Sequence, residues 1–233
     1  MAVGIFSYGS GSGQAFTYKG GVYSTLTVPG STMTIAFAVN SLGQIVGGYA
    51  DNSGTLHGFV DTAGAFTQVD YPGAVQTAVT DMNTAGDMAG IWFDSTTSHG
   101  FIDQGGVFTS IDFPGATFTQ AAGLNAADEV VGIYTDASSV QHGFILNAGV
   151  YTQLDPPQST QTIAFGVNDA GTISGSYADA SNNGHGFLYS AGIFNRVDVA
   201  GAKGTQLTHI PTKGAFAGYF TDQLDEIHGV TGH

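Results

Sequence analysis

The sequence predicts an all-β protein, a β-propeller built from four-stranded blades. One stretch, residues 45–73, returns along the chain with small changes. Its histidine recurs at spacings of 42, 43, 43 and 43 residues, as His57, His99, His142, His185 and His228. Glycine is abundant, with 36 residues, and charged residues make up 9% of the chain, against roughly 25% in an average soluble protein. A four-stranded unit repeated every ~40–50 residues is typical of a propeller.

Each repeat contains four strand-like segments, A to D, separated by glycine-rich turns. Segment A covers Thr34–Asn40, Thr77–Asn83, Thr119–Asn125, Thr162–Asn168 and Thr205–Pro211. Segment B carries glycine and an aromatic residue and ends at an aspartate, segment C carries His-Gly-Phe, and segment D carries Phe-Thr and ends at Asp. Alternating apolar positions in short runs between turn residues predict strands.

We expect a single propeller domain over residues 1–233. Its repeat units are 31–73, 74–115, 116–158, 159–201 and 202–233, the last closing with 1–30. Residues 3–18 form a degenerate copy of segments B and C, in which Gln14 replaces the histidine and Tyr8 the aspartate. Five blades are expected, with segment D from Val22–Gly30 completing the blade of residues 205–230. Six blades, two of them incomplete, are the alternative; pairing of the terminal strands would remove an open sheet edge.

The glycine of segment B is present in all five repeats. We interpret it as the point where sheets of adjacent blades approach too closely for a Cβ atom. The residues are Gly47, Gly90, Gly132, Gly175 and Gly218.

The charge excludes one class of partner. The formal net charge is −14, and the only basic side chains apart from histidine are Lys19, Arg196, Lys203 and Lys213. Nucleic acid would be repelled. Membrane insertion is not expected, because no apolar run has spanning length and no basic amphipathic segment is present. The chain has no cysteine, which excludes disulfides and thiolate chemistry.

The repeated pattern N-x-x-G-x-I-V-G-x-Y-x-D, then H-G-F, then G-x-F-T-x-I-D-x-P-G resembles the bacterial HAF family of extracellular repeats. The resemblance covers nearly the whole chain, with glycine where that family often has alanine after the histidine, as at Gly58. It implies a propeller and an extracellular or periplasmic location, although the N-terminus lacks the pattern of a signal peptide. It transfers no catalytic residue.

The recurrent histidines are interpreted as structural. In a propeller their strand is the third from the axis, so the copies stand too far apart to share a zinc ion. Each histidine is expected to bond an aspartate of segment B or D, which makes Asp51, Asp70, Asp94 and Asp112 structural as well. No metal and no cofactor are expected, although calcium at an Asp-rich loop such as residues 51–54 stays an open alternative.

Residues that depart from the repeat are the candidates for function. Trp92, Tyr219 and Arg196 are candidate ligand-binding residues. Asp81 and His209 replace small residues at one position of segment A, whose other members are Ala38, Gly123 and Gly166. They are candidate catalytic residues, because histidine exchanges protons near neutral pH and an aspartate could orient a hydroxyl.

Three classes of function follow. The first is a secreted or cell-surface module that binds a glycan or another small neutral polar ligand, at the channel mouth or between blades. The second is an enzyme, similar to a lyase or isomerase, with acid–base chemistry at His209 and Asp81. The third is a structural or protein-interaction scaffold. The sequence alone does not decide whether the protein is an enzyme, because propellers carry all three functions.

Overall fold

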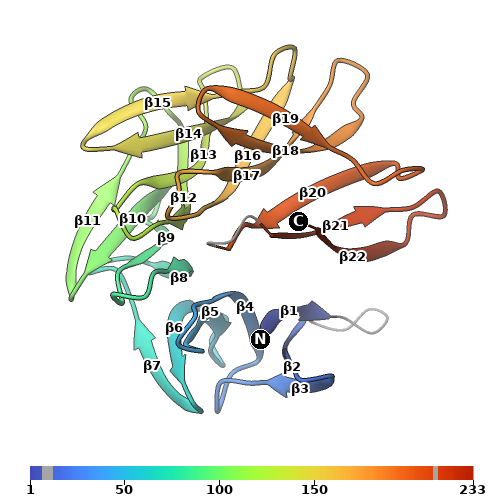
Figure 1. Cartoon of the computed structure of the whole chain (residues 1–233). Coiled ribbons are helices and arrows are strands. Elements are labelled where there is room, and N and C mark those ends of the chain that lie inside the picture. Colours follow the sequence, from blue (N-terminus) through green and yellow to red (C-terminus); the bar gives the residue numbers. More distant parts are fainter. Residues whose placement is uncertain (7–12, 212–214, 233) are drawn as a thin grey trace. The chain divides into compact units, whose positions relative to one another are not determined.

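The computed structural model describes residues 1–6, 13–211 and 215–232, and their regular elements are all β-strands (Figure 1). Tyr8 and Lys213 lie outside the described residues. The chain divides into two compact units, residues 1–111 and 112–233, which are described separately. Within the described ranges, no helix is long and apolar enough to cross a membrane.

Unit 1 contains three antiparallel sheets. The first has β1 (Ala2–Phe6), β2 (Gln14–Lys19) and β3 (Val22–Leu26). The second has β4 (Met33–Val39), β5 (Ile45–Ala50), β6 (Leu56–Thr62) and β7 (Ala65–Val69). The third has β8 (Gln76–Met82), β9 (Met88–Phe93), β10 (Ser98–Gln104) and β11 (Val107–Ile111). A single parallel pair, Gln14 with Thr34, joins the first two into one seven-stranded sheet.

Unit 2 also contains three antiparallel sheets. The first has β12 (Phe118–Leu124), β13 (Val130–Thr135), β14 (Gln141–Asn147) and β15 (Val150–Leu154). The second has β16 (Gln161–Val167), β17 (Ile173–Ala178), β18 (Gly184–Ser190) and β19 (Ile193–Val197). The third has β20 (Gly204–His209), β21 (Phe216–Thr221) and β22 (Ile227–Gly232). The parallel pair Gly184 with Gly204 joins the last two.

The all-β prediction is confirmed. In each complete sheet, segments A to D become the first to fourth strands in sequence order, each antiparallel to the next. The segment expected at Thr34–Asn40, for example, is β4 at Met33–Val39.

The closure expected for Val22–Gly30 differs from the observed pairing. Strand β3, which begins at Val22, pairs with β2 in the N-terminal sheet instead of completing the sheet of residues 205–230. The cause is the turn Gly20–Gly21, whose φ angles of 60° and 87° are both positive. Two glycines in this conformation form the tight hairpin that connects neighbouring antiparallel strands. The described strands therefore form six sheets, two of them three-stranded.

A β-bulge interrupts the first strand of each sheet from β4 onward. The register shifts fall at Ala36/Ala38, Val79/Asp81, Ala121/Gly123, Ala164/Gly166 and Leu207/His209. A bulge bends its strand and increases the local twist. The position of segment A that varies between small and titratable residues directly follows this bulge.

The segment B glycine is required by crowding inside its own sheet. A Cβ atom on Gly132 would lie 2.0 Å from the carbonyl oxygen of Gln120 in β12 and 2.8 Å from the ring of Phe144 in β14. The interpretation that these glycines mark the close approach of adjacent sheets is therefore wrong, because the atoms that crowd them belong to their own sheet. Two neighbouring sheets of unit 2 do meet at Gly123, where a Cβ atom would lie 2.9 Å from the Cα atom of Gly166.

The phenylalanine of each His-Gly-Phe fills the space above the segment B glycine. Phe59, Phe101, Phe144 and Phe187 are all 0% exposed. In unit 1, Phe101 of the third sheet belongs to one apolar cluster with Val46 and Val69 of the second sheet. The apolar cores thus lie between consecutive sheets, and burial of each ring contributes about 1.5–3 kcal/mol.

We expect Gly132→Ala to destabilise the protein by about 3 kcal/mol or more, because its methyl group would overlap a backbone oxygen that cannot move alone. Urea unfolding followed by circular dichroism measures this. Gly166→Ala is the matched control, since the nearest atom to its added methyl group is Ser174 Oγ at 3.3 Å. Equal losses of stability in the two variants would contradict this account of the glycine.

Candidate functional site

The histidine of the third strand lies between two aspartates, an arrangement we call the histidine brace. His142 Nδ1 lies 2.7 Å from Asp155 Oδ2, and its Nε2 lies 3.6 Å from Asp136 Oδ2. His57 has the same arrangement, 2.9 Å from Asp70 and 3.6 Å from Asp51. One aspartate follows the second strand and the other follows the fourth, so the brace links three strands of one sheet.

The brace varies among the other sheets. His185 lies 3.1 Å from Asp198 and 3.3 Å from Asp179. His99 Nε2 lies 3.5 Å from Asp94 Oδ2, while Asp112 is the first residue of unit 2. In the last sheet, which has three strands, His228 Nε2 lies 2.9 Å from Asp222 Oδ2.

Local interactions hold the brace in place. The Asp136 carboxylate accepts hydrogen bonds from the backbone N–H groups of Ser138 and Val140, at 2.8 Å each, and so fixes the turn between β13 and β14. The imidazole of His142 stacks on Tyr134, with ring centroids 5.0 Å apart. These contacts explain the position of the histidine ring without a metal ion.

Among the described residues, one group of side chains could bring three ligand atoms to a metal ion. Oxygen and nitrogen atoms of Asp222, Glu226 and His228 all lie within 4.8 Å of one another. His228 already bonds Asp222, and Glu226 is exposed. The grouping is explained by the turn that Asp222 forms, and we assign no metal to it.

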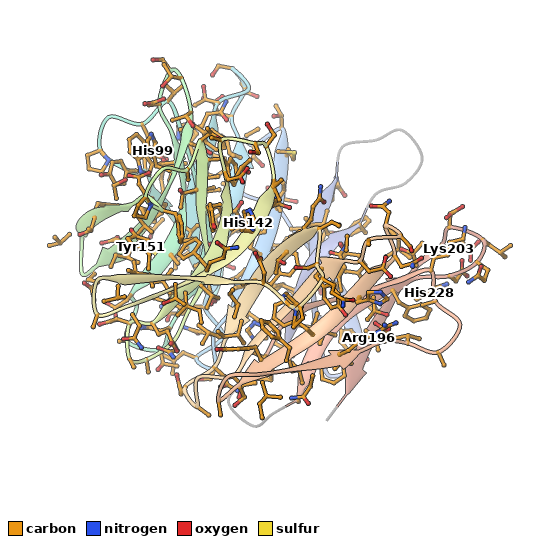
Figure 2. The ribbon with its side chains drawn as sticks, turned by 90° about the horizontal axis from the view of Figure 1, so that it is seen from above. His99, His142, Tyr151, Arg196, Lys203 and His228 are labelled. Atoms are coloured by element: carbon orange, nitrogen blue, oxygen red, sulfur yellow. The ribbon has the colours of Figure 1, made fainter. Side chains whose placement is uncertain are left out.

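A polar pocket of about 740 Å³ opens in unit 2, between the sheet of β16–β19 and the sheet of β20–β22. Arg196 in β19 and Lys203, just before β20, both line it (Figure 2). The other polar side chains of its wall are Asp179, Asn182, Asn183, His185, Asp198, Thr205 and Gln223. Two of the chain's four Lys and Arg residues thus lie in one pocket.

The two cations at the pocket are each paired with a carboxylate. Arg196 Nε donates to Asp198 Oδ2. Lys203 Nζ lies 2.6 Å from Asp225 Oδ1. Asn183 Nδ2 donates to Asp179 Oδ2 at 2.9 Å, and this side-chain bond is the largest of the interactions that hold the pKa of Asp179 well below its usual range. Three carboxylates, of Asp179, Asp198 and Asp225, thus stand against two cations, and the pocket is rich in hydrogen-bonding groups with a slight excess of negative charge.

One wall of the pocket includes Val199, which stands where two other repeats have an aromatic residue. In two other sheets, the residue that follows the segment D aspartate is aromatic. Its ring stacks on the segment B aromatic residue of the following sheet. Tyr71 lies 4.3 Å from Trp92 and Phe113 lies 3.7 Å from Tyr134 between ring centroids. Val199 holds this position after Asp198. Pro156 holds the equivalent position after Asp155, and both side chains are smaller than the rings of Tyr71 and Phe113.

The turn that carries Val199 keeps the geometry of its counterparts. The backbone N–H of Val199 donates to Thr205 Oγ1 at 3.0 Å, as that of Tyr71 does to Thr77 Oγ1 at 3.1 Å. The substitution by Val199 therefore leaves the hydrogen bond of this turn in place.

Arg196 is the one residue of the three predicted ligand-binding positions that lines this pocket. Trp92 stacks on Tyr71 and also on His99, whose centroid is 4.3 Å away, so both faces of its indole ring are covered. Tyr219 donates its hydroxyl to Gln206 Oε1 at 2.6 Å, and burial raises its pKa.

Asp81 and His209 belong to different units, Asp81 to β8 and His209 to β20. Both follow the bulge of their strand. Asp81 Oδ1 accepts the backbone N–H of Met82 at 2.9 Å. His209 is exposed at the end of its strand. Asp81 and His209 therefore each stand directly after the bulge in their own strand.

Lys203, Asn183 and Gln223 were not among the predicted site residues. In the sequence, Lys203 stood out only as one of four basic side chains, and Asn183 and Gln223 were not singled out. One signal was available, the replacement of the usual aromatic-Pro pair by Val199–Ala200 directly after Asp198.

Comparison with protein-family models and with curated protein sequences gives no match. Several solved structures are similar in fold. A lectin from Aleuria aurantia in complex with α-methyl-L-fucoside has a TM-score of 0.58 at 10% identity, over 97% of this chain and 85% of that chain. TolB from Acinetobacter baumannii has 0.63 at 9% identity, over 95% of this chain and 60% of that chain.

A catalytically inactive virginiamycin B lyase from Staphylococcus aureus, with quinupristin, has a TM-score of 0.55 at 14% identity, over 96% of this chain and 74% of that chain. Together these likenesses show that the fold is an all-β, propeller-like one. At such low identities they show the fold alone, and a lectin and a lyase share it.

We expect His142→Ala to destabilise the protein by about 1–3 kcal/mol, because it leaves two aspartates without the group that links them. His228→Ala is the control, since that histidine has one aspartate contact and a 42% exposed side chain. Its loss should be below about 1 kcal/mol. Urea unfolding compares the two variants, and equal losses would contradict the bracing role.

Acid should weaken the protein through the turn aspartates. The Ser53 hydroxyl and the Thr55 backbone N–H lower the pKa of Asp51 to about 2. A carboxylate with a lowered pKa stabilises the fold above its unfolded pKa of ~3.9 and loses this contribution as the pH falls through its folded pKa. We therefore expect the urea midpoint to fall between about pH 4 and pH 2. Asp51→Asn should make the urea midpoint depend less on pH in this range. A midpoint of the unsubstituted protein that stays constant down to pH 2 would contradict the prediction.

Proposed function

We propose that the protein is a secreted or cell-surface binding module with a six-bladed propeller, in which the two three-stranded sheets count as blades. Its ligand is a neutral glycan or another small neutral polar molecule. The binding site is the pocket between the sheet of β16–β19 and the sheet of β20–β22. The observation that carries this proposal is a pocket lined by polar side chains whose two cations are already paired with carboxylates.

The chemistry of the wall suits hydroxyl groups. Asp179 and Asp198 provide acceptors, Lys203 provides a donor, and Asn183 and Gln223 provide both. A sugar hydroxyl both donates and accepts, so neighbouring hydroxyls can each find a partner in such a wall. An Arg side chain adds a planar set of donors that an ammonium group does not offer.

The volume suits a small ligand. At about 740 Å³ the pocket lies within the ~300–1,000 Å³ range of small-molecule sites. The net charge of −14 and the carboxylate partners of Arg196 and Lys203 both disfavour an anionic ligand.

The histidine in the pocket does not favour catalysis there. His185 is 5% exposed, and each of its ring nitrogens faces an aspartate, Asp198 or Asp179. A ring held on both sides has no free nitrogen with which to take a proton from a substrate. A binding role therefore fits this pocket better than an acid–base reaction.

Two further observations support the proposal. The Aleuria aurantia lectin, whose fold is described as a six-bladed β-propeller, binds fucosides. The resemblance of the repeats to the HAF family supports the location outside the cytoplasm. Nucleic acid is not proposed as a partner, because of the acidic charge.

The test begins with a glycan array, followed by calorimetry on the best ligand. Two other repeats carry glutamine at the position of Arg196, as Gln68 and Gln153. Arg196→Gln should therefore be tolerated by the fold, and it should weaken ligand binding about tenfold or more. Val199→Tyr should restore the missing ring and abolish binding without loss of stability. Phe113→Tyr, at the equivalent position of another sheet, is the matched control and should bind normally. Salt-sensitive binding to polyanions alone, or unchanged affinity in both pocket variants, would refute the proposal.

A further inference from the structure

The hydroxyl group of Tyr177 in β17 lacks the partner that its counterparts have. In the sheet of β12–β15, Tyr134 donates its hydroxyl to Gln153 Oε1 at 2.9 Å. The same bond joins Tyr49 to Gln68 Oε1 at 2.7 Å in the sheet of β4–β7. In the sheet of β16–β19 the tyrosine is kept, but an arginine replaces the glutamine.

That arginine, Arg196, takes over only half of the role of the glutamine. Its Nε donates to Asp198 Oδ2. In the sheet of β12–β15, Gln153 Nε2 donates in the same way to Asp155 Oδ2, at 2.6 Å. A guanidinium group has five N–H donors and no acceptor, so Arg196 cannot receive the hydroxyl hydrogen of Tyr177. Among the described residues, no other side chain or backbone group accepts this hydrogen.

The hydroxyl group lies beside the pocket. The Tyr177 ring contacts the ring of His185, with centroids 5.0 Å apart, and its hydroxyl interacts with the guanidinium of Arg196. His185 and Arg196 both line the pocket, and the Arg196 side chain is 58% exposed. Burial raises the pKa of Tyr177, so the hydroxyl keeps its hydrogen at neutral pH. A donor without an acceptor therefore stands next to the outer N–H groups of Arg196.

We propose that Tyr177 is a ligand-binding residue of this pocket. Its hydroxyl donates a hydrogen bond to an uncharged oxygen atom of the ligand, and an outer N–H group of Arg196 donates to the same atom. The inference rests on the proposed function, because it assigns a further residue to that site. A hydroxyl oxygen and the carbonyl oxygen of an acetamido group each accept two hydrogen bonds, so a glycan offers such an oxygen in either form.

The charges of the pocket wall favour an uncharged oxygen at this point. Asp198 accepts from Arg196 Nε and lies 3.1 Å from His185 Nδ1, so the positive charge of the guanidinium already has a partner. A carboxylate on the ligand would compete with Asp198 and would approach Asp179, which also lines the pocket. Such like-charge contacts are unfavourable. A neutral oxygen avoids them and uses the donors that Asp198 leaves available.

The test compares two deletions of a hydroxyl group. Tyr177→Phe should change the melting temperature little, because the exposed N–H groups of Arg196 can bond water instead. It should weaken binding of the best glycan about three- to tenfold in calorimetry. Tyr134→Phe is the matched control, since its hydroxyl bonds Gln153. It should lower the melting temperature by about 2–4 °C and leave the affinity unchanged. Equal falls in melting temperature would show that Tyr177 has an acceptor within the protein and would contradict the proposal.

A series of ligands identifies the oxygen atom. Deoxy analogues of the best glycan remove its hydroxyl or acetamido groups one at a time. One of these changes should weaken binding to the unsubstituted protein, and the same change should cost the Tyr177→Phe variant little further affinity. Equal losses in the two proteins for every analogue would overturn the proposal.

A second background checks the role of Arg196. In Arg196→Gln, the glutamine should accept the hydroxyl of Tyr177, as in the two other sheets. Adding Tyr177→Phe to this variant should therefore lower the melting temperature and cause no further loss of affinity. Unchanged affinity of Tyr177→Phe alone, with weakened binding by Arg196→Gln, would overturn this inference and leave the proposed function standing. An unsubstituted protein that binds no glycan and no other neutral polar molecule would refute the proposed function and this inference with it.

Discussion

The close passage of the first strand over the second is the constraint on which each sheet depends. The backbone oxygen of Gln120 in the first strand lies 2.0 Å from where a Cβ atom on Gly132 would lie, just before the bulge at Ala121/Gly123. Because this residue is glycine, the ring of Phe144 can lie over the backbone of β13. That ring then becomes fully buried. In each of the four four-stranded sheets, one missing methyl group thus allows a fully buried phenylalanine ring to pack.

This constraint also marks the limit of prediction from sequence. The strand at Met33–Val39 was predicted within one residue, because alternating apolar residues between turns carry a strong signal. The role of Gly132 was misassigned, because a bulge has no reliable sequence pattern and the neighbour it crowds is known only from the register. Val22–Gly30 was assigned to the wrong sheet, because recurrence along the chain was weighted above the hairpin chemistry of Gly20–Gly21.

The candidate site was harder to predict than the fold. Arg196 was found because it departs from the residue at the same position in other repeats. Lys203 and Gln223 were missed, because they lie in loops between strands and only the structure shows that these loops line one pocket. The recurrent histidines bond aspartates of their own sheets, whereas the candidate pocket includes Arg196 and Val199, which depart from the repeat.

The antiparallel pairing of each sheet has a consequence for how such a chain can change in length. Every four-stranded sheet is made from one continuous segment whose strands pair with their neighbours in sequence. Such contacts are local, and local contacts form quickly during folding. Duplication of a gene segment of about 43 codons would add a whole sheet with its own bulge, glycine and brace, in the manner of other repeat proteins. The segment of chain that forms one sheet is therefore the same segment that one such duplication would add.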